Sequence, residues 1–235
     1  MPPAPPPQIT TGGRERVPQT SILYSDSFRT DPTVTYMLAN LSPPARHAYL
    51  YTYFTALVTG AALNHAVFSE AADFSSCLVL MPPGCRADNP FTLLQAGLLG
   101  VLWNIGLKGV WRMLAEFGPM TDAVKAKGLK GRTKYYYVFF VATHAEARGR
   151  GHSSALIRDA QARATEQGVP LWIEATTEYS WRLYESLGFE TVERMALGKG
   201  VVAADGTPKV SGEGVALWGM VWWPSKLATD ELAAT

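Results

Sequence analysis

The sequence is poor in cysteine and lacks the residue spacings of a disulfide-rich or metal-binding protein. Its 235 residues include two cysteines, Cys77 and Cys85, which are too few for a disulfide framework. We therefore expect both thiols to be reduced, in a soluble, intracellular and cytoplasmic protein. The four histidines, at positions 47, 65, 144 and 152, have no metal-ligand spacing, so no metal is predicted.

Strong charge and an unbroken apolar segment are also lacking. Charged residues make up 17% of the chain and the net charge is +1, which predicts no nucleic-acid partner. Residues 48–69 and 89–107 are uncharged apolar runs that approach the length of a membrane span. Polar residues interrupt them, Asn64 and His65 in the first and Gln95 in the second. We interpret both runs as buried helices of a soluble core and expect no membrane partner.

The stretch 135–154, YYYVFFVATHAEARGRGHSS, contains the most informative pattern. Its apolar, aromatic and β-branched start, residues 135–141, predicts a buried strand. Residues 148–154 then place two glycines directly before a helical pattern. Glycine allows a tight turn and a close approach of the backbone to a ligand, and the first amides of a helix have no partner within it. The pattern predicts a site for a phosphate group.

At these residues the sequence resembles the GCN5-related N-acetyltransferases, the GNAT superfamily, whose acetyl-CoA loop reads Gln/Arg-x-x-Gly-x-Gly/Ala after the fourth strand. The matching residues here are Arg148, Gly151 and Ser153, with the small Ser in the last position. A second segment, LYESLGF at residues 183–189, is similar to the family's LYExLGF. The resemblance covers roughly residues 135–190 and is loose elsewhere.

The resemblance implies an α/β (α+β) GNAT fold. This is a mixed, mostly antiparallel central sheet of about seven strands, splayed between strands 4 and 5, with helices on both faces. Residues 1–18 are rich in Pro and Gly and predict a flexible arm, without the basic and apolar regions of a secretory signal. Residues 19–235 are expected to form one acetyltransferase domain. Residues 88–128 are predicted to be a helical insertion between strands 3 and 4, serving either the acceptor side or a homodimer contact.

Periodicity and turn residues place the elements along the chain. Asp31 followed by Pro32 predicts the start of a helix. Helices are predicted at 33–41, 45–63, 154–167 and 177–187, and strands at 22–28, 66–71, 77–81, 135–141, 169–176, 189–197 and 214–222. In the strand 169–176, alternation predicts Leu171, Ile173 and Ala175 on one face and Trp172, Glu174 and Thr176 on the other.

The resemblance implies acetyl-CoA as the cosubstrate. The arm of pantetheine would pair with the strand residues Val141, Ala142 and Thr143 as if it were another strand. The pyrophosphate would be bound by Arg148, Gly149, Arg150, Gly151, His152, Ser153 and Ser154. Thr177 stands where many relatives carry an Asn that bonds pantetheine. The basic run at residues 125–134 is either a solvated segment or a contact for the CoA 3′-phosphate.

Two residues are predicted to be catalytic. Tyr184 matches the family's helical Tyr near the CoA sulfur, and a phenol with a pKa of about 10 suits protonation of a thiolate. Glu174 is the predicted general base, acting through a water; the alternative is a buried carboxylate that fixes a loop amide. Asp31 and Glu178 are weaker candidates for the base.

These residues predict an acetyl-CoA-dependent N-acetyltransferase that acts on the amine of a small molecule by direct transfer. Aromatic residues in the helix 45–63, namely Tyr49, Tyr51, Tyr53 and Phe54, either line an acceptor pocket or pack in the core. The alternatives are an acetyltransferase for protein N-termini or lysines, and a non-catalytic CoA-binding sensor or interaction protein.

Overall fold

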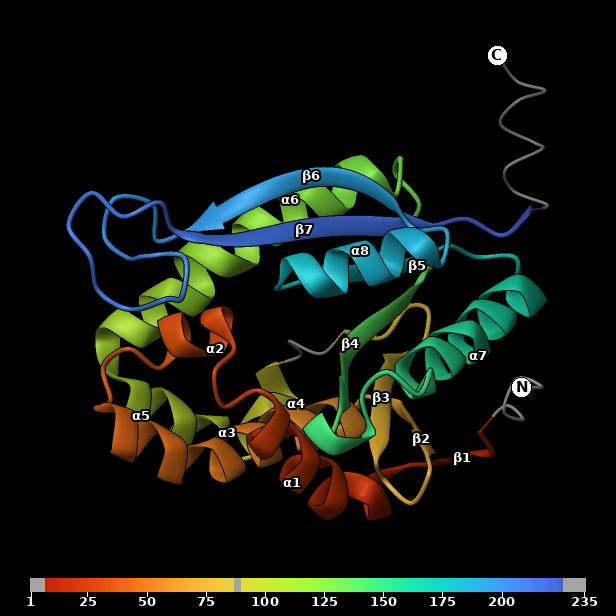
Figure 1. Ribbon diagram of the computed structural model, residues 1–235, viewed down its shortest axis with the longest axis horizontal. Helices are drawn as coiled ribbons and strands as arrows, with labels where there is room; N and C mark the ends of the chain where they lie inside the picture. Colours follow the sequence, from red (N-terminus) through yellow and green to blue (C-terminus); the bar gives the residue numbers. More distant parts are fainter. Residues whose placement is uncertain (1–6, 87–89, 226–235) are drawn as a thin grey trace.

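The structure is a computed structural model that describes residues 7–86 and 90–225 (Figure 1). The described strands form one seven-stranded sheet in the order β1-β2-β3-β4-β5-β7-β6. They are β1 (Ile9–Gly12), β2 (Val67–Ala71), β3 (Ser76–Met81), β4 (Tyr136–Thr143), β5 (Leu171–Ala175), β6 (Glu190–Leu197) and β7 (Val215–Trp222). The helices are α1 (Val17–Ser27), α2 (Pro32–Met37), α3 (Pro43–Leu63), α4 (Pro90–Gln95), α5 (Leu98–Trp111), α6 (Gly118–Gly128), α7 (His152–Gln167) and α8 (Glu178–Ser186). Short turns are η1 (Arg14–Arg16), the π-helical η2 (Arg112–Phe117) and η3 (Ala145–Ala147).

The sheet separates in its middle, between β4 and β5. These two strands are parallel and pair only from Tyr136↔Leu171 to Val138↔Ile173. On its other side β4 remains paired with the antiparallel β3 as far as Thr143. All other neighbouring strands in the described sheet are antiparallel. The predicted mixed, mostly antiparallel sheet, splayed between strands 4 and 5, is confirmed.

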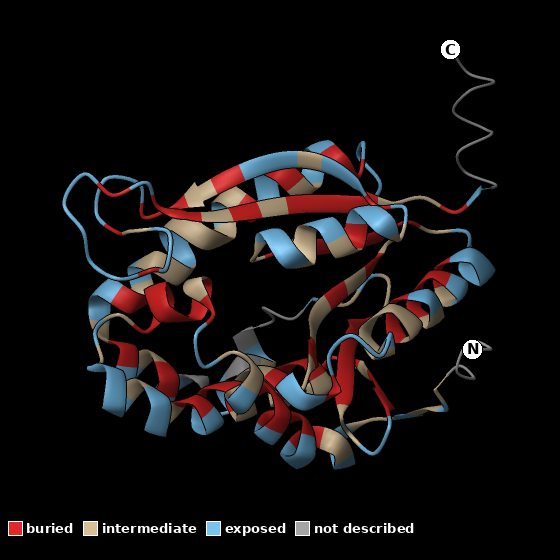
Figure 2. Ribbon diagram, viewed as in Figure 1, coloured by how far each residue is buried: buried red, intermediate tan, exposed pale blue. Residues whose placement is uncertain are grey.

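Helices cover both faces of the sheet, and the buried residues concentrate along the strands and the helix sides that face them (Figure 2). The helices α1 and α3 pack against β3 and β4. The helix α7 packs on the opposite face, and α6 packs on β6 and β7. Alternation along β5 serves both faces, because Ile173 joins the core beneath α7 and α8 while Trp172 joins the core beneath α6. The predicted alternation of this strand is therefore confirmed.

The first strand and the first helix differ from the prediction. Of residues 22–28, predicted to be a strand, residues 22–27 belong to helix α1 and Phe28 is its C-cap; Pro18 lies in the first turn of this helix. Its buried residues Val17, Leu23 and Tyr24 follow helical spacing. Residues 9–18, predicted to be part of a flexible arm, form β1, η1 and the start of α1. The first six residues of the predicted arm lie outside the described residues.

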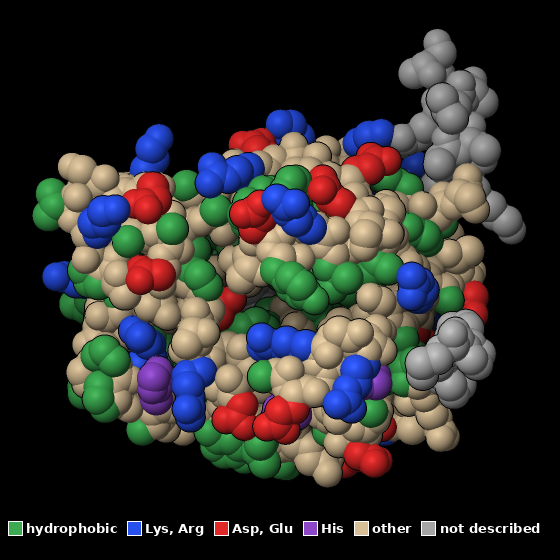
Figure 3. All heavy atoms as spheres, in the orientation of Figure 1, with side chains coloured by type: hydrophobic (Ala, Val, Ile, Leu, Met, Phe, Trp, Pro, Cys, Tyr) green, Lys and Arg blue, Asp and Glu red, His purple; other side chains and the backbone are tan. Residues whose placement is uncertain are grey.

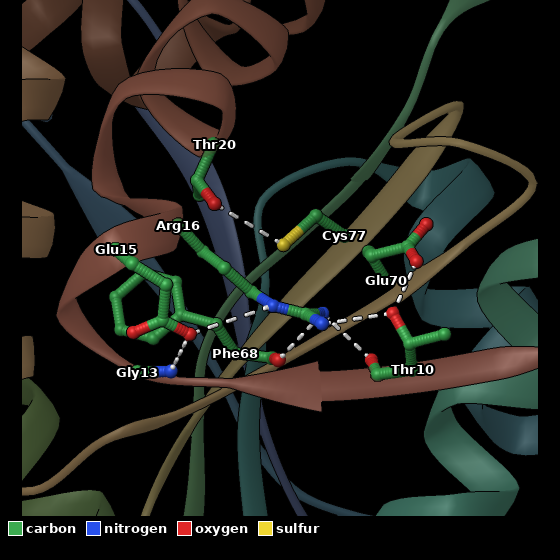
Figure 4. A network of polar contacts seen from close by, with 8 residues as sticks. All are labelled: Thr10, Gly13, Glu15, Arg16, Thr20, Phe68, Glu70 and Cys77. Atoms are coloured by element: carbon green, nitrogen blue, oxygen red, sulfur yellow. Dashed lines mark hydrogen bonds and ion pairs between the residues drawn. The ribbon is translucent and has the colours of Figure 1, made fainter.

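Arg16 ties β1 to the sheet (Figure 4). Its guanidinium donates to the Thr10 carbonyl oxygen and to Thr10 Oγ1, both at 2.8 Å, and to the Phe68 carbonyl oxygen at 3.3 Å. Thr10 in turn donates to the Glu70 carboxylate on β2. The side chain of Arg16 is 15% exposed. Hydrogen bonds from a charged donor are stronger than neutral ones, so these contacts stabilise β1, a strand of four residues at the edge of the sheet.

Replacing Arg16 with Ala should lower the free energy of unfolding by about 1.5–3 kcal/mol, because the buried carbonyl oxygens of Thr10 and Phe68 lose a charged donor. Urea unfolding of the native and variant proteins measures this difference. Arg14→Ala is the matched control, since Arg14 is exposed in the same turn η1. Equal effects of the two substitutions would contradict a specific role for Arg16.

The predicted helix start at Asp31 is confirmed, and a distant loop presses against it. Asp31 is the N-cap of α2, and its Oδ1 accepts from the backbone amide of Val34 at 3.0 Å. The loop between β6 and β7 reaches this helix at Gly206. A Cβ on Gly206, whose φ is +81°, would lie 2.2 Å from the Pro32 carbonyl oxygen. Only glycine allows this approach, which fixes α2 over the splayed strands.

Candidate active site

A cleft of about 1780 Å³ opens where β4 and β5 part. Figure 3 shows the hollow near the middle of this face. Its walls come from β4, β5, the loop before α7, helix α8, the segment around α2, and the helical insertion between β3 and β4. Segments distant in the sequence therefore meet around one space, and the chemistry of the site follows from what each contributes.

The first contribution is an open strand edge. Beyond Val138, β4 continues to Thr143, and in the described sheet β5 no longer pairs with it. Val141, Ala142 and Thr143 line the cleft along this edge. Backbone groups without a strand partner bind an extended ligand in the manner of an added strand.

The second contribution is the loop that leads into α7. Gly149 and Gly151 have φ values of +74° and +80°, and Gly151 is the N-cap of the helix. A Cβ built on either glycine meets no protein atom within 4 Å. Ala155 is the first residue here whose amide bonds back along the helix, to the Gly151 carbonyl oxygen at 2.9 Å. The preceding amides form the positive end of the helix dipole, which favours an anion.

A chain of hydroxyl groups joins the strand edge to the loop. Thr143 Oγ1 lies 2.6 Å from Ser153 Oγ and 2.8 Å from Ser76 Oγ. Ser76 also donates to the Ala142 carbonyl oxygen at 2.9 Å. Ser153, the position that departs from the Gly/Ala of the motif, therefore fixes the end of β4 against the first turn of α7.

Tyr184 projects from α8 into the cleft. The residue is 6% exposed, and within the described part of the chain its hydroxyl makes no hydrogen bond to the protein. Burial, followed by the negative charge of Asp31, raises its pKa. The phenol therefore stays protonated across the physiological range and remains able to donate a hydrogen bond to a ligand.

Glu174 lines the cleft from β5, but its carboxylate already forms a hydrogen bond and an ion pair with other side chains. Its Oε1 accepts from Trp172 Nε1 at 2.6 Å and lies 3.8 Å from Lys125 Nζ. The side chain is 7% exposed. Lys125 Nζ also lies 4.7 Å from the centre of the Tyr137 ring. The carboxylate is therefore buried and paired with a cation, and its partners here are the Trp172 indole and Lys125 rather than the loop amide of the second interpretation.

Asp31 is a buried carboxylate of the opposite kind. It is 8% exposed and lines the cleft, and within the described residues no Lys or Arg pairs with it. Its Oδ2 accepts from Thr176 Oγ1 at 2.7 Å, and Val34 donates to Oδ1. Burial raises the pKa of Asp31 from its ordinary value, although both hydrogen bonds oppose that shift. The charge of Asp31 in turn raises the pKa of Tyr53 and of Tyr184.

The comparison with known families agrees with this geometry. Residues 113–189 match the family model described as the acetyltransferase (GNAT) family. This segment of the chain is similar to the GNAT family. The match includes the strand, the loop and both motifs on which the sequence prediction depends.

Similar proteins extend the comparison along the chain. An uncharacterized N-acetyltransferase of Schizosaccharomyces pombe is 26% identical over 165 residues, which span 70% of this chain and 66% of that protein, just under two thirds. The structure described as histone acetyltransferase HPA2 and related acetyltransferase from Corynebacterium glutamicum has a TM-score of 0.62 and 19% identity, covering 94% of this chain and 98% of its own. Arylalkylamine N-acetyltransferase 2 from Aedes aegypti has a TM-score of 0.60 and 16% identity, covering 92% and 98%. The two structural likenesses show that the chain has the GNAT fold.

The predicted cofactor residues of the GNAT loop lie together, with one exception. Those that line the cleft are Val141, Ala142, Thr143, Arg148, Gly149, Gly151, His152, Ser153, Ser154 and Thr177. Arg150 is exposed and does not line the cleft. Thr177 is the N-cap of α8, and its Oγ1 accepts from the amide of Ser180 at 3.1 Å.

Two observations on the loop indicate that it fits the polar groups of CoA. Its glycines leave open space where a Cβ would stand. His152 Nδ1 is buried and has no hydrogen-bond partner in the described part of the chain. Buried polar atoms in native proteins are nearly always paired, so this nitrogen points to a bound ligand.

The aromatic helix contributes less to the cleft than its composition suggests. Of the four aromatic residues of α3 considered above, Tyr53 lines the cleft. Phe54 is fully buried and packs against Tyr24 and Phe140 in the core. The insertion supplies further apolar lining through Met113 and Phe117.

The basic run at residues 125–134 lies before β4, whereas the loop 148–154 follows it. The members of the run contact protein side chains: Lys127 pairs with Glu193 at 3.0 Å, and Arg132 stacks over Trp223. The side chain of Lys125 is 13% exposed, so this residue does not fit the interpretation of the basic run as a solvated segment. In residues 7–86 and 90–225, no group of three or more His, Cys, Asp or Glu is arranged to hold a metal ion.

Proposed function

We propose that the protein transfers the acetyl group of acetyl-CoA to the amino group of a small molecule. The observation that carries this proposal is the meeting of three features in one cleft. These are the open edge of β4, the amides at the start of α7, and the unpartnered hydroxyl of Tyr184. An extended thioester with a pyrophosphate at one end matches this order of groups.

In the proposed complex, the amides of the loop 149–154 and the side chain of Arg148 bind the pyrophosphate. The pantetheine arm runs along Val141, Ala142 and Thr143 and pairs with the free edge of β4. This path directs the thioester toward Tyr184 and Asp31, and burial together with the charge of Asp31 raises the pKa of Tyr184.

The proposed transfer is a direct displacement. The acceptor enters as an ammonium ion, and Asp31 binds it and removes one proton, which leaves a neutral amine. Asp31 passes this proton to solvent. The amine nitrogen then attacks the thioester carbonyl carbon and a C–N bond forms, the nitrogen loses its second proton to Asp31, which releases it to solvent, and the C–S bond breaks. The leaving sulfur takes a hydrogen bond and then a proton from Tyr184, which recovers its proton from solvent. Glu174 is the alternative base, and its existing pairing with Lys125 makes it the weaker of the two.

The lining supports a small amine with an apolar body. Asp31 provides one buried negative charge, and Phe28, Tyr53, Met113 and Phe117 provide apolar and aromatic surface in the same cleft. An ammonium ion is attracted both to a carboxylate and to aromatic faces. Asp31 is nearly inaccessible to solvent, which favours a small amine over the lysine of a folded protein. An arylalkylamine acetyltransferase and the polyamine N-acetyltransferase of Drosophila melanogaster share this fold, and amines of those types head the test panel.

Thermal unfolding with and without acetyl-CoA tests the cofactor part of the proposal. At a concentration of 100 times its dissociation constant, acetyl-CoA should stabilise the native protein by about 2.7 kcal/mol, while ATP and NAD should not. Gly151→Ala should weaken acetyl-CoA binding about tenfold or more, because a Cβ there fills the space next to the bound phosphates.

Gly168→Ala is the matched control. Gly168 ends the same helix with φ of +61°, and its Cβ would also meet nothing within 4 Å, so it carries a similar backbone strain far from the cleft. Both variants should melt earlier than the native protein, but only Gly151→Ala should lose affinity. Thiol release is then followed with arylalkylamines, polyamines and lysine peptides. Stabilisation without thiol release for any amine would indicate a CoA-binding protein that is not an enzyme.

A further inference from the structure

The helical insertion presents a large apolar face to solvent. Seven of the twelve large hydrophobic side chains that are exposed in the described structure lie between residues 91 and 114, with 57–90% of their surface accessible. They are Phe91, Leu94, Leu99, Trp103, Leu107, Trp111 and Leu114. Leu99 and Trp103 lie four residues apart before the kink of α5 at Gly106, and Leu107, Trp111 and Leu114 lie three or four residues apart after it, so each group follows one side of its own helical segment. We call these seven residues the insertion face.

The opposite side of the same segment is anchored to the protein. Val101 and Ile105 are buried against the core, next to α3. Arg112 donates to the Tyr36 carbonyl oxygen and to Asn40 Oδ1, both at 3.2 Å. Glu116 accepts from Tyr36 at 2.5 Å and from the amide of Gly198 at 2.6 Å. These contacts fix the orientation of the segment and hold the insertion face outward.

The surroundings of the insertion face lack negative charge. The insertion has no Asp or Glu from residue 89 to residue 115, and the chain has none from residue 32 to residue 69, which includes α3. Helix α3 lies against α5 in the fold (Figure 1). Arg46 and Lys108 are basic side chains of these two stretches, with His47 next to Arg46 in the sequence, while Arg112 is bound on the anchored side. The apolar face therefore lies in a cationic, acid-free region, although acidic residues are 20 of the 235.

We propose that the insertion face binds to the surface of an anionic lipid membrane, with Trp103 and Leu107 entering the boundary between headgroups and acyl chains. Tryptophan is enriched at this boundary, and a helix that lies in it combines an apolar side with basic flanks. Anionic headgroups complement the local excess of Lys and Arg. This replaces the expectation from the sequence that no membrane takes part. Among the described helices none is long and apolar enough to cross a bilayer, so the contact is with the surface.

A second copy of the chain fits the insertion face less well. A twofold contact places the same patch on both sides, so basic residues would oppose basic residues with no carboxylate between them. Trp103 and Leu107 are 88% and 90% exposed, so they protrude, and protruding side chains enter a soft lipid layer more readily than a flat identical face. Leu114 belongs to both the insertion face and the cleft lining, so a bound membrane would lie beside the cleft.

Sedimentation with vesicles tests this proposal on the full chain. The native protein should bind vesicles of phosphatidylcholine with phosphatidylserine, and bind those of phosphatidylcholine alone less strongly. Trp103→Ser and Leu107→Ser should each lower partitioning about tenfold. Val210→Ser is the matched control, because Val210 is 93% exposed in the loop between β6 and β7, and it should bind like the native protein.

Two further measurements keep the outcome clear if a variant folds poorly. The tryptophan emission of the native protein should shift to the blue on addition of the anionic vesicles, and sedimentation velocity should show a monomer without them. Absence of vesicle binding by the native protein would overturn the proposal. So would a native dimer that Leu107→Ser separates, because the face would then join two copies of the chain, and so would equal losses in Leu107→Ser and Val210→Ser.

Discussion

Asp31→Asn should lower the turnover number by roughly a hundredfold or more, the usual effect of removing a general base. The amide keeps the N-cap of α2, because Asn accepts from the Val34 amide as Asp does. It can also exchange a hydrogen bond with Thr176, so the position of the side chain should be preserved. What the variant loses is the negative charge that binds the acceptor ammonium and takes its proton. Steady-state kinetics with the best amine of the panel measures this effect.

The same substitution should leave the unliganded protein as stable as the native one, or more stable, at neutral pH. Burial raises the pKa of Asp31 in the folded state above its value in the unfolded chain. The folded state therefore binds more protons, and its stability falls as the pH rises through the raised pKa. Asn does not ionise, so the variant does not lose stability in this way as the pH rises. In the native protein kcat/KM should fall as the pH drops through the same pKa, and this acidic limb should be missing in the variant.

Glu174→Gln decides between the two carboxylates of the cleft. Gln can still accept a hydrogen bond from Trp172 Nε1, but it cannot form the ion pair with Lys125. Lys125 then retains its other ion pair, with Asp122 at 3.6 Å. We expect a loss of stability and a smaller change in turnover than for Asp31→Asn. A large loss of turnover in Glu174→Gln, with nearly native turnover in Asp31→Asn, would assign the base to Glu174 and refute the role proposed for Asp31.

The parts of the molecule that the sequence predicts well are those with a local signal. The strand β5 shows alternation, and Gly168 ends α7 as predicted. Asp31 and Pro32 start α2 through contacts within four residues. The loop 148–154 could be recognised because its glycines and the helix that follows are adjacent in the chain.

The parts that the sequence did not predict depend on contacts between distant residues. The strand β1 has four residues of weak apolar character, and its place depends on hydrogen bonds from Arg16 to Thr10 and Phe68. The environment of Asp31 depends on Thr176, 145 residues later in the chain. The pairing of Glu174 with Lys125 depends on the packing of α6 against the sheet. Residue type alone gave no reason to rank Asp31 above Glu174, because burial and partners decide the state of a carboxylate.

Tyr184→Phe should lower the turnover number at least about tenfold and leave the affinity for acetyl-CoA nearly unchanged. The substitution removes one hydroxyl, which makes no hydrogen bond to the protein in the described part of the chain, so the fold loses little. The phenol matters when negative charge develops on the leaving sulfur, and an interaction made only in the transition state changes turnover rather than binding. Because burial and the charge of Asp31 raise the pKa of Tyr184, the native hydroxyl stays protonated through neutral and mildly alkaline pH. The loss of turnover in Tyr184→Phe should therefore be the same at every pH in that range. Asp31→Asn differs, because it should change the shape of the pH profile by removing its acidic limb.

Two tyrosines serve as controls for Tyr184→Phe. Tyr136 is buried outside the cleft, and its hydroxyl accepts from Gln167 Nε2 at 2.7 Å, so Tyr136→Phe should cost some stability and no turnover. Tyr53 lies in the cleft, and the charge of Asp31 raises its pKa as well, but it comes from α3 rather than α8. Tyr53→Phe should change the KM for the amine more than the turnover number, because Tyr53 contributes to the acceptor wall. Native turnover in Tyr184→Phe with a tenfold loss in Tyr53→Phe would move the proton donor to α3, and native turnover in both would mean that solvent protonates the thiolate.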